Sequence, residues 1–96
     1  MIRDMDLVRR ILLELEADEW NDGRQQFAVN GYDNQIVAYH LIIMDEAGLL
    51  IALDNSTLSE ISAVPMRLTW AGHEFLDSVR DDATWRNIKT QAERVG

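Results

Sequence analysis

The stretch IVAYHLIIMDEAGLL, residues 36–50, decides the fold that this sequence predicts. Apolar side chains recur there at helical spacing and cover more than half of the helix circumference. Asp33 precedes them as an N-cap, and Gly48 can take the left-handed conformation that ends many helices. Leu49 can then fold back on the last turn. The residues expected on one side are Ile36, Tyr39, His40 and Ile43, with Val37, Leu41 and Met44 widening the apolar arc.

A β-hairpin is predicted directly after this helix. Residues 49–53 form an apolar run that indicates a buried strand, and the polar residues that follow favour a turn. Residues 61–68 alternate loosely and end in a second strand, which Pro65 places at a sheet edge because it has no N–H to donate. Thr69 can cap a further helix that continues to about Val79.

Two more helices flank this centre. The first is expected from about Asp4, its cap, to Ala17, and the last begins where Asp81 and Asp82 interrupt the chain. Between the first two helices, residues 18–23 have turn chemistry, and residues 25–29 alternate as a short strand. The apolar side of the first helix is expected to carry Val8, Ile11, Leu12 and Leu15, and that of the last helix Trp85, Ile88 and Ala92.

This order of elements predicts one α+β domain, residues 1–96, of winged-helix (winged helix-turn-helix-like) type. It contains about four helices and a small antiparallel β-hairpin or sheet. The middle helix of a standard helix-turn-helix is missing or reduced, because only about fifteen residues of turn and strand character separate the first two helices.

Several segments carry a resemblance to known proteins. Residues 36–50 and 68–76 resemble the recognition helix and the end of the wing in many bacterial regulators. The sequence also resembles, from Arg3 to about Ile88, an uncharacterised bacterial and phage family, number 2513 among domains of unknown function. That resemblance implies a winged-helix-like fold and a bacterial or phage context, but no activity. Its segments are RDMDL at 3–7, GY at 31–32, AYHL at 38–41, AGL at 47–49, RLTW at 67–70 and GHEFLD at 72–77.

The charge of the chain is strongly negative and unevenly distributed. The formal net charge is −8, and residues 1–66 hold twelve acidic groups against four basic ones, whereas residues 67–96 hold five of each. A surface of this kind repels phosphates, and DNA affinity depends on lysine and arginine contacts with phosphates.

No chemistry-bearing motif is present. The chain has no cysteine, so thiolate catalysis and zinc–cysteine sites are excluded, and no phosphate-binding glycine loop or metalloprotease motif occurs. His40 lies among apolar residues and is expected to pack in the core. We therefore expect a non-enzymatic protein without cofactor or metal. Because it has no apolar run long enough for a signal peptide or a membrane span, we expect it in the cytoplasm.

Two function hypotheses stay open. In the first, the protein is a DNA-binding regulator, whose second helix reads bases while arginines contact the backbone. In the second, it is an acidic protein–protein interaction module, an adaptor or nucleic-acid mimic that engages a basic partner. A homodimer through the last helix, with Trp85, Ile88 and Ala92, is a further expectation. The residues expected to contact DNA or a partner are Asn34, Gln35, Ala38, Ile42, Arg9, Arg10 and Arg24.

Overall fold

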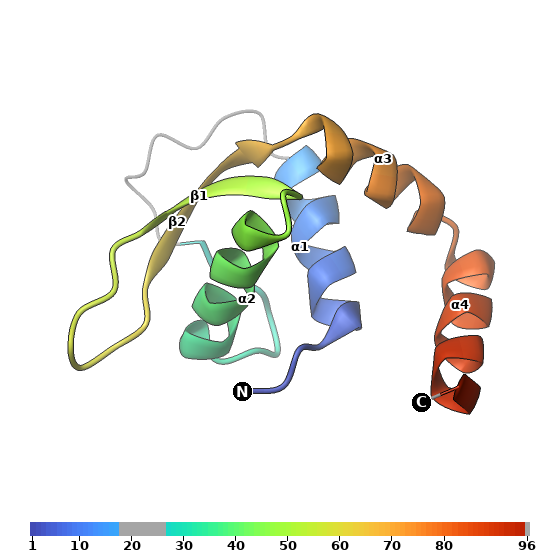
Figure 1. The fold of residues 1–96 in the computed structure, drawn as a ribbon, viewed down its shortest axis with the longest axis horizontal. Helices are drawn as coiled ribbons and strands as arrows, with labels where there is room; N and C mark the ends of the chain where they lie inside the picture. The colour runs from blue at the N-terminus through green and yellow to red at the C-terminus, as the bar shows by residue number, and fades with distance from the viewer. Residues whose placement is uncertain (18–26, 96) are drawn as a thin grey trace.

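The computed structural model describes residues 1–17 and 27–95, and side chains among them as far as residue 90. Within these ranges there are four helices and one two-stranded antiparallel hairpin, which projects at the opposite end of the molecule from α4 (Figure 1). This is the predicted α+β arrangement, and it is consistent with a winged-helix-like fold. The elements are α1 (Met5–Ala17), α2 (Asn34–Glu46), β1 (Leu50–Asp54), β2 (Ala63–Leu68), α3 (Trp70–Val79) and α4 (Asp82–Val95).

Each helix begins at a side chain that accepts hydrogen bonds from its first turn. The acceptor oxygens lie 2.7–3.3 Å from the backbone nitrogens that donate to them. Such caps satisfy N–H groups that have no partner inside the helix, and each contributes about 1 kcal/mol. All four caps are the predicted residues: Asp4, Asp33, Thr69 and Asp81.

The core lies where α1, α2 and α3 meet beneath the hairpin. His40, on α2, is fully buried beside the start of α1; its Nε2 accepts from the backbone N–H of Asp4 at 2.8 Å, and its Nδ1 lies 2.8 Å from the carbonyl oxygen of Ile36. Both ring nitrogens are therefore satisfied, and the expectation that His40 packs in the core is confirmed. The apolar core consists of Leu7, Val8, Ile11, Leu12, Val29, Val37, Leu41, Met44, Leu50, Leu68, Leu76, Val79 and Trp85.

The buried side of α2 is rotated from the predicted one. Ile36 is 36% exposed, and Tyr39 and Ile43 are only half-buried, whereas Ala38 is buried. Because α2 is apolar around most of its circumference, its periodicity cannot select which side meets the core. The hairpin and the core each take one side of the helix. A third side faces residues 1–4, which precede α1 and which we call the N-terminal segment.

The hairpin is bent by a β-bulge. Residue Ile51 pairs with Arg67, but the next residue, Ala52, pairs with Pro65, so that Met66 is the extra residue. Pro65 is buried on the inner side of this two-stranded sheet. The strands begin or end one or two residues from the predicted positions, which is the usual uncertainty of such boundaries.

The connection from α1 to α2 differs from the expectation where it is described. Residues 27–29 form no strand, so the predicted strand over 25–29 is wrong in that part. The predicted turn at 18–23 lies outside the described residues, as do Arg24 and the beginning of the predicted strand.

Leu49 joins α2, the hairpin and α3. Its N–H donates to the carbonyl of Met44 at 3.0 Å, which together with Gly48 at φ 81° forms the predicted helix end. The carbonyl of Leu49 accepts from the N–H of Thr69 at 3.1 Å. A Cβ atom built on Gly72 would lie 1.8 Å from that same carbonyl oxygen, so only glycine fits there.

We predict that Gly72→Ala destabilises the fold. The added methyl group meets backbone rather than a movable side chain, so the cost should reach the upper end of the range for overpacking, about 1–3 kcal/mol. Ala71→Ser, at the exposed neighbouring position, is the matched control. Urea unfolding followed by circular dichroism measures both; an unchanged midpoint for Gly72→Ala would show that α3 does not approach Leu49 this closely.

Candidate functional site

The side of α2 that was expected to read DNA is covered by the chain's own hairpin. The amide oxygen of Gln35 accepts from the N–H of Ile61 at 2.7 Å, and a carboxylate oxygen of Asp45 accepts from the N–H of Ala52 at 2.7 Å. Ala38 between them is only 7% exposed. The expectation that this side of α2 faces solvent is therefore wrong at Gln35 and Ala38, whereas Asn34 is exposed as expected. The hairpin folds onto it because two side chains satisfy hairpin amides there.

Little of α2 remains for a nucleic-acid contact. Among the residues of this helix, Asn34, Ile36 and Glu46 are exposed, and they lie near opposite ends. Ile42 is half-buried. A recognition helix needs several polar side chains that reach base edges along one side. The four predicted contacts on α2 do not form such a side.

The predicted arginine contacts are engaged within the protein. Arg9 donates through Nε to the carbonyl of Val79 at 2.7 Å, and one of its terminal nitrogens lies 2.6 Å from a carboxylate oxygen of Asp82. Its side chain is only 16% exposed. Arg10 pairs with Glu14 on the same helix at 3.1 Å. Arg24 lies outside the described residues.

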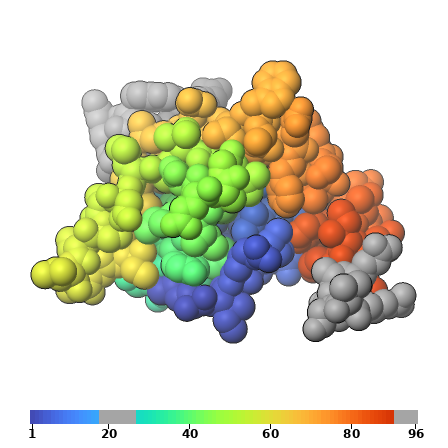
Figure 2. Space-filling view, viewed as in Figure 1, coloured from blue at the N-terminus to red at the C-terminus, as the bar shows by residue number. Residues whose placement is uncertain are grey.

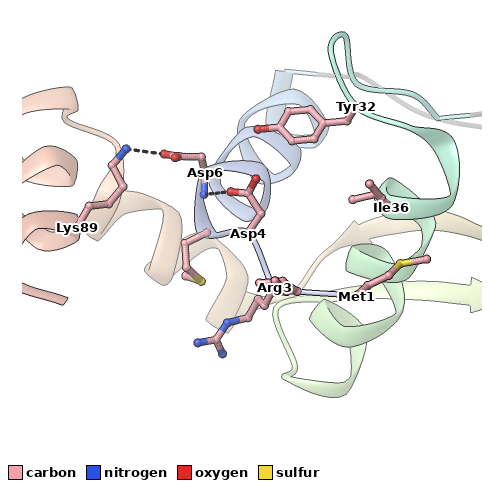
Figure 3. A pocket seen from close by; sticks show the side chains of 9 residues that line it. Met1, Arg3, Asp4, Asp6, Tyr32, Ile36 and Lys89 are labelled. Carbon is pink, nitrogen blue, oxygen red and sulfur yellow. Dashed lines mark hydrogen bonds and ion pairs between the residues drawn. The ribbon is translucent and has the colours of Figure 1, made fainter. Parts of the chain in front are cut away.

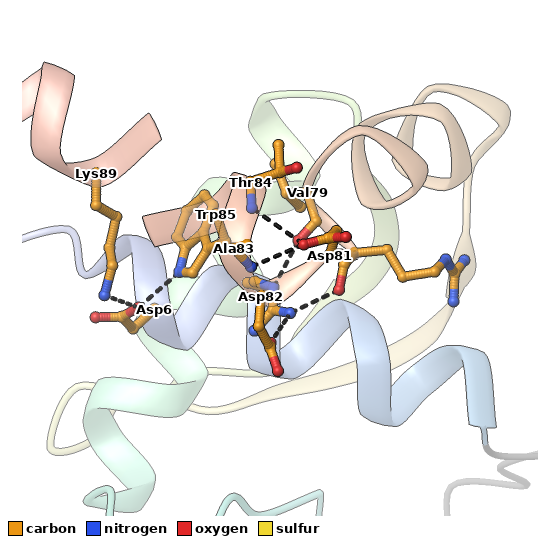
Figure 4. Close-up of polar contacts among 10 residues, drawn as sticks. Asp6, Val79, Asp81, Asp82, Ala83, Thr84, Trp85 and Lys89 are labelled. Carbon is orange, nitrogen blue, oxygen red and sulfur yellow. Dashed lines mark hydrogen bonds and ion pairs between the residues drawn. The ribbon is translucent and has the colours of Figure 1, made fainter. Parts of the chain in front are cut away.

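Asp6 holds α4 against α1. One of its carboxylate oxygens accepts from the indole N–H of Trp85 at 2.8 Å and from the ammonium of Lys89 at 2.9 Å (Figure 4). The hydrogen bonds from Lys89 and then Trp85 hold the pKa of Asp6 below its ordinary value. Arg9 and Lys89 both lie within about 6 Å of the Trp85 ring, which is itself 5% exposed.

The apolar stripe predicted for the last helix is thus divided. Trp85 packs against its own domain, whereas Ile88 is 40% exposed. The side chain of Ala92 lies outside the described part. Sequence reasoning missed the role of Asp6, because the pair that it forms with Trp85 spans 79 positions in the chain.

Two adjacent hollows border the N-terminal segment. The first, of about 770 Å³, lies between Asp4, Asp6, Tyr32, Ile36 and Lys89 (Figure 3). Burial, and then the nearby carboxylates, raise the pKa of Tyr32. Asp4 in this hollow caps α1, and Asp6 pairs with Lys89. Both carboxylates are therefore used to hold the fold together.

The second hollow, which we call the α2–α3 groove, measures about 710 Å³. It is mostly apolar, and Arg3 is the charged residue among the described residues that line it. Its other lining residues are Ile2, Met5, Val8, Tyr39, Ile43, Met44, Ala47, Leu49 and Phe75.

Charge separates the fold into two parts. Residues 27–66, which comprise α2 and most of the hairpin and which we call the acidic lobe, contain five carboxylates and no lysine or arginine. Figure 1 shows α2 and the hairpin at one end of the molecule and α4 at the other. The carboxylates are Asp33, Asp45, Glu46, Asp54 and Glu60, and all but Asp45 are exposed.

Within the described ranges, His, Asp and Glu side chains do not gather in groups of three or more that could hold a metal ion. The helices found there are also too short or too polar to cross a membrane.

Comparison with known proteins gives relatives without an assigned role. A family described as "Hypothetical protein (DUF2513)" matches residues 2–96. An uncharacterised protein of Haemophilus influenzae is 42% identical over 91 residues, which cover 94% of this chain and 77% of the relative. No solved structure matches the chain.

We predict that Asp6→Ala loosens α4 and lowers stability by about 1 kcal/mol, since the side chain is half exposed and contributes one surface ion pair and one hydrogen bond. Asp6→Asn, which keeps an acceptor for Trp85, should lose less. In a Trp20→Phe, Trp70→Phe background, the emission of Trp85 should shift to the red in Asp6→Ala only.

This effect has a defined pH dependence. Because the folded-state pKa of Asp6 is lowered, its stabilisation is present above its ordinary value of 3.8 and is lost as the pH falls through the folded-state value. The difference in unfolding free energy between wild type and Asp6→Ala should therefore be constant near neutral pH and shrink below pH 3.8. A difference that does not depend on pH would contradict the ion pair.

Proposed function

The chain belongs to the DUF2513 family of hypothetical proteins, and we propose that it is a non-catalytic protein-interaction module whose acidic lobe binds a basic partner protein. The observation that carries this proposal is the lobe itself: residues 27–66, which comprise α2 and the hairpin as far as Met66, hold five carboxylates and no lysine or arginine. A winged helix would contact DNA with this helix and hairpin. Complementary charge gives such a surface a fast and selective encounter with a cationic protein.

Exposed apolar side chains on the hairpin support a protein partner. Ile51, Leu53 and Met66 are 38%, 58% and 47% exposed, and Arg67 at the base of the hairpin is the nearest cation along the chain. Apolar side chains grouped beside charges are typical of protein-binding surfaces.

The competing function is DNA binding, which the order of helix and hairpin favours by analogy alone. Phosphate contacts would have to come from outside the lobe, where Arg9, Arg80 and Lys89 already form ion pairs with the protein's own carboxylates. We therefore propose that duplex DNA is not the ligand.

Two titrations test the proposal. Labelled random duplex DNA should bind no more tightly than the non-specific range of about 10⁻⁴ to 10⁻⁶ M, with a log–log salt slope no steeper than about −4. A synthetic amphipathic peptide of lysine and leucine should shift backbone amide resonances of the acidic lobe. The same peptide with glutamate in place of lysine should not.

Charge reversal locates the surface. The triple variant Glu46→Lys, Asp54→Lys, Glu60→Lys should lose the basic peptide. A variant reversed outside the lobe at Glu14, Glu74 and Asp77, whose printed side-chain contacts are local in sequence, should keep it. Equal loss of peptide binding in both variants would show that binding depends on the net charge of the protein and not on the acidic lobe. Tight binding of duplex DNA with a steep salt slope would overturn the proposed function.

A further inference from the structure

The hairpin loop presents an apolar side chain from a braced turn. The N–H of Asn55 donates to the carbonyl of Ser62 at 3.0 Å, and the N–H of Thr57 donates to the carbonyl of Glu60 at 2.9 Å. The hydroxyls of Ser56 and Thr57 accept from further loop amides. Leu58, at the tip, is fully exposed. A loop with this many internal hydrogen bonds loses little freedom on binding, so Leu58 is pre-organised as an anchor.

Negative charge surrounds this anchor. Asp54 and Glu60 are exposed on either side of the tip, and hydrogen bonds from the side chain and backbone of Ser56 lower the pKa of Asp54. The loop is therefore suited to an apolar hollow with a cationic rim.

The α2–α3 groove has that character. Its lining is mostly apolar, from α1, α2, α3 and the N-terminal segment, and Arg3 is the charged residue among the described residues that line it. The loop of the same chain projects from the end of the molecule away from α3 (Figure 1), whereas the groove is lined by Phe75 of α3. Figure 2 shows α2, α3 and the N-terminal segment together on one face, and the loop at its margin.

We propose that the protein associates with itself, the loop of one copy inserting Leu58 into the α2–α3 groove of a second copy, with Asp54 and Glu60 beside Arg3. This goes beyond the proposed function and does not depend on it. We choose a second copy as the occupant because one sequence supplies both parts of the contact. Leu58 and the groove are both apolar, and the carboxylates beside Leu58 are opposite in charge to Arg3. Nucleic acid and anionic lipid would be repelled by the same carboxylates.

Sedimentation velocity over a wide range of protein concentration, with no other protein present, measures the association. Leu58→Ser should weaken it about tenfold or more, because the anchor no longer buries an apolar side chain. Ile88→Ser, a matched apolar-to-polar change at an exposed position of α4, should leave it unchanged. Leu58 is fully exposed, so its variant should keep the wild-type melting temperature.

A charge exchange tests the pairing. Glu60→Arg and Arg3→Glu should each weaken the association about fivefold, and the double variant should restore it, since it re-forms an opposite pair. The loop hydrogen bonds of Glu60 use its backbone, so they remain. A monomer at every concentration, a double variant as weak as the single ones, or weakening by Ile88→Ser in place of Leu58→Ser would overturn the proposal. No basic peptide is present in these experiments, so a failure of self-association leaves the proposed function standing.

Discussion

Two acceptors on α2 hold the hairpin against the helix, and the character of the surface depends on them. The amide of Gln35 and the carboxylate of Asp45 each accept from a hairpin N–H at 2.7 Å. A hydrogen bond to a neutral acceptor contributes about 1 kcal/mol net, and one to a charged acceptor about 1.5–3 kcal/mol. They also satisfy backbone groups that would otherwise stand unpaired next to an apolar helix. With the hairpin closed, Ala38 is buried, and the exposed polar residues of α2, Asn34 and Glu46, lie near opposite ends of the helix.

Cations outside the acidic lobe form ion pairs with carboxylates of the same protein. Arg9 joins α1 to the end of α3 and to Asp82, Arg80 pairs with Glu16 and Asp77, and Lys89 pairs with Asp6. These cations are used to join helices, so their charge is compensated locally. Among the residues that the structure describes, no lysine or arginine forms an ion pair with a carboxylate of the acidic lobe. It is this contrast, more than the total charge of −8, that favours a cationic protein over a nucleic acid as the ligand.

Local features of the fold could be predicted from the sequence, and long-range ones could not. The helix caps Asp33 and Thr69 and the helix end at Gly48 could be predicted, because each depends on residues only a few positions away in the chain. The side of α2 that meets the hairpin was not predictable, since apolar residues nearly encircle that helix and its partner is chosen by tertiary packing. The engagement of Arg9 could not be predicted for the same reason: Arg9 meets Val79 across 70 positions, and no local pattern records that pairing.

The closed hairpin is the central claim, and amide hydrogen exchange at Ala52 and Ile61 tests it most directly. Both N–H groups donate to side chains of α2, so in the native protein they should exchange much more slowly than the amide of Leu58 at the exposed loop tip. Asp45→Ala should release Ala52, and Gln35→Ala should release Ile61, each without melting the helix. Exchange of Ala52 and Ile61 as fast as that of Leu58 in the wild-type protein would mean that the hairpin stands open and that α2 is free to act as a recognition helix.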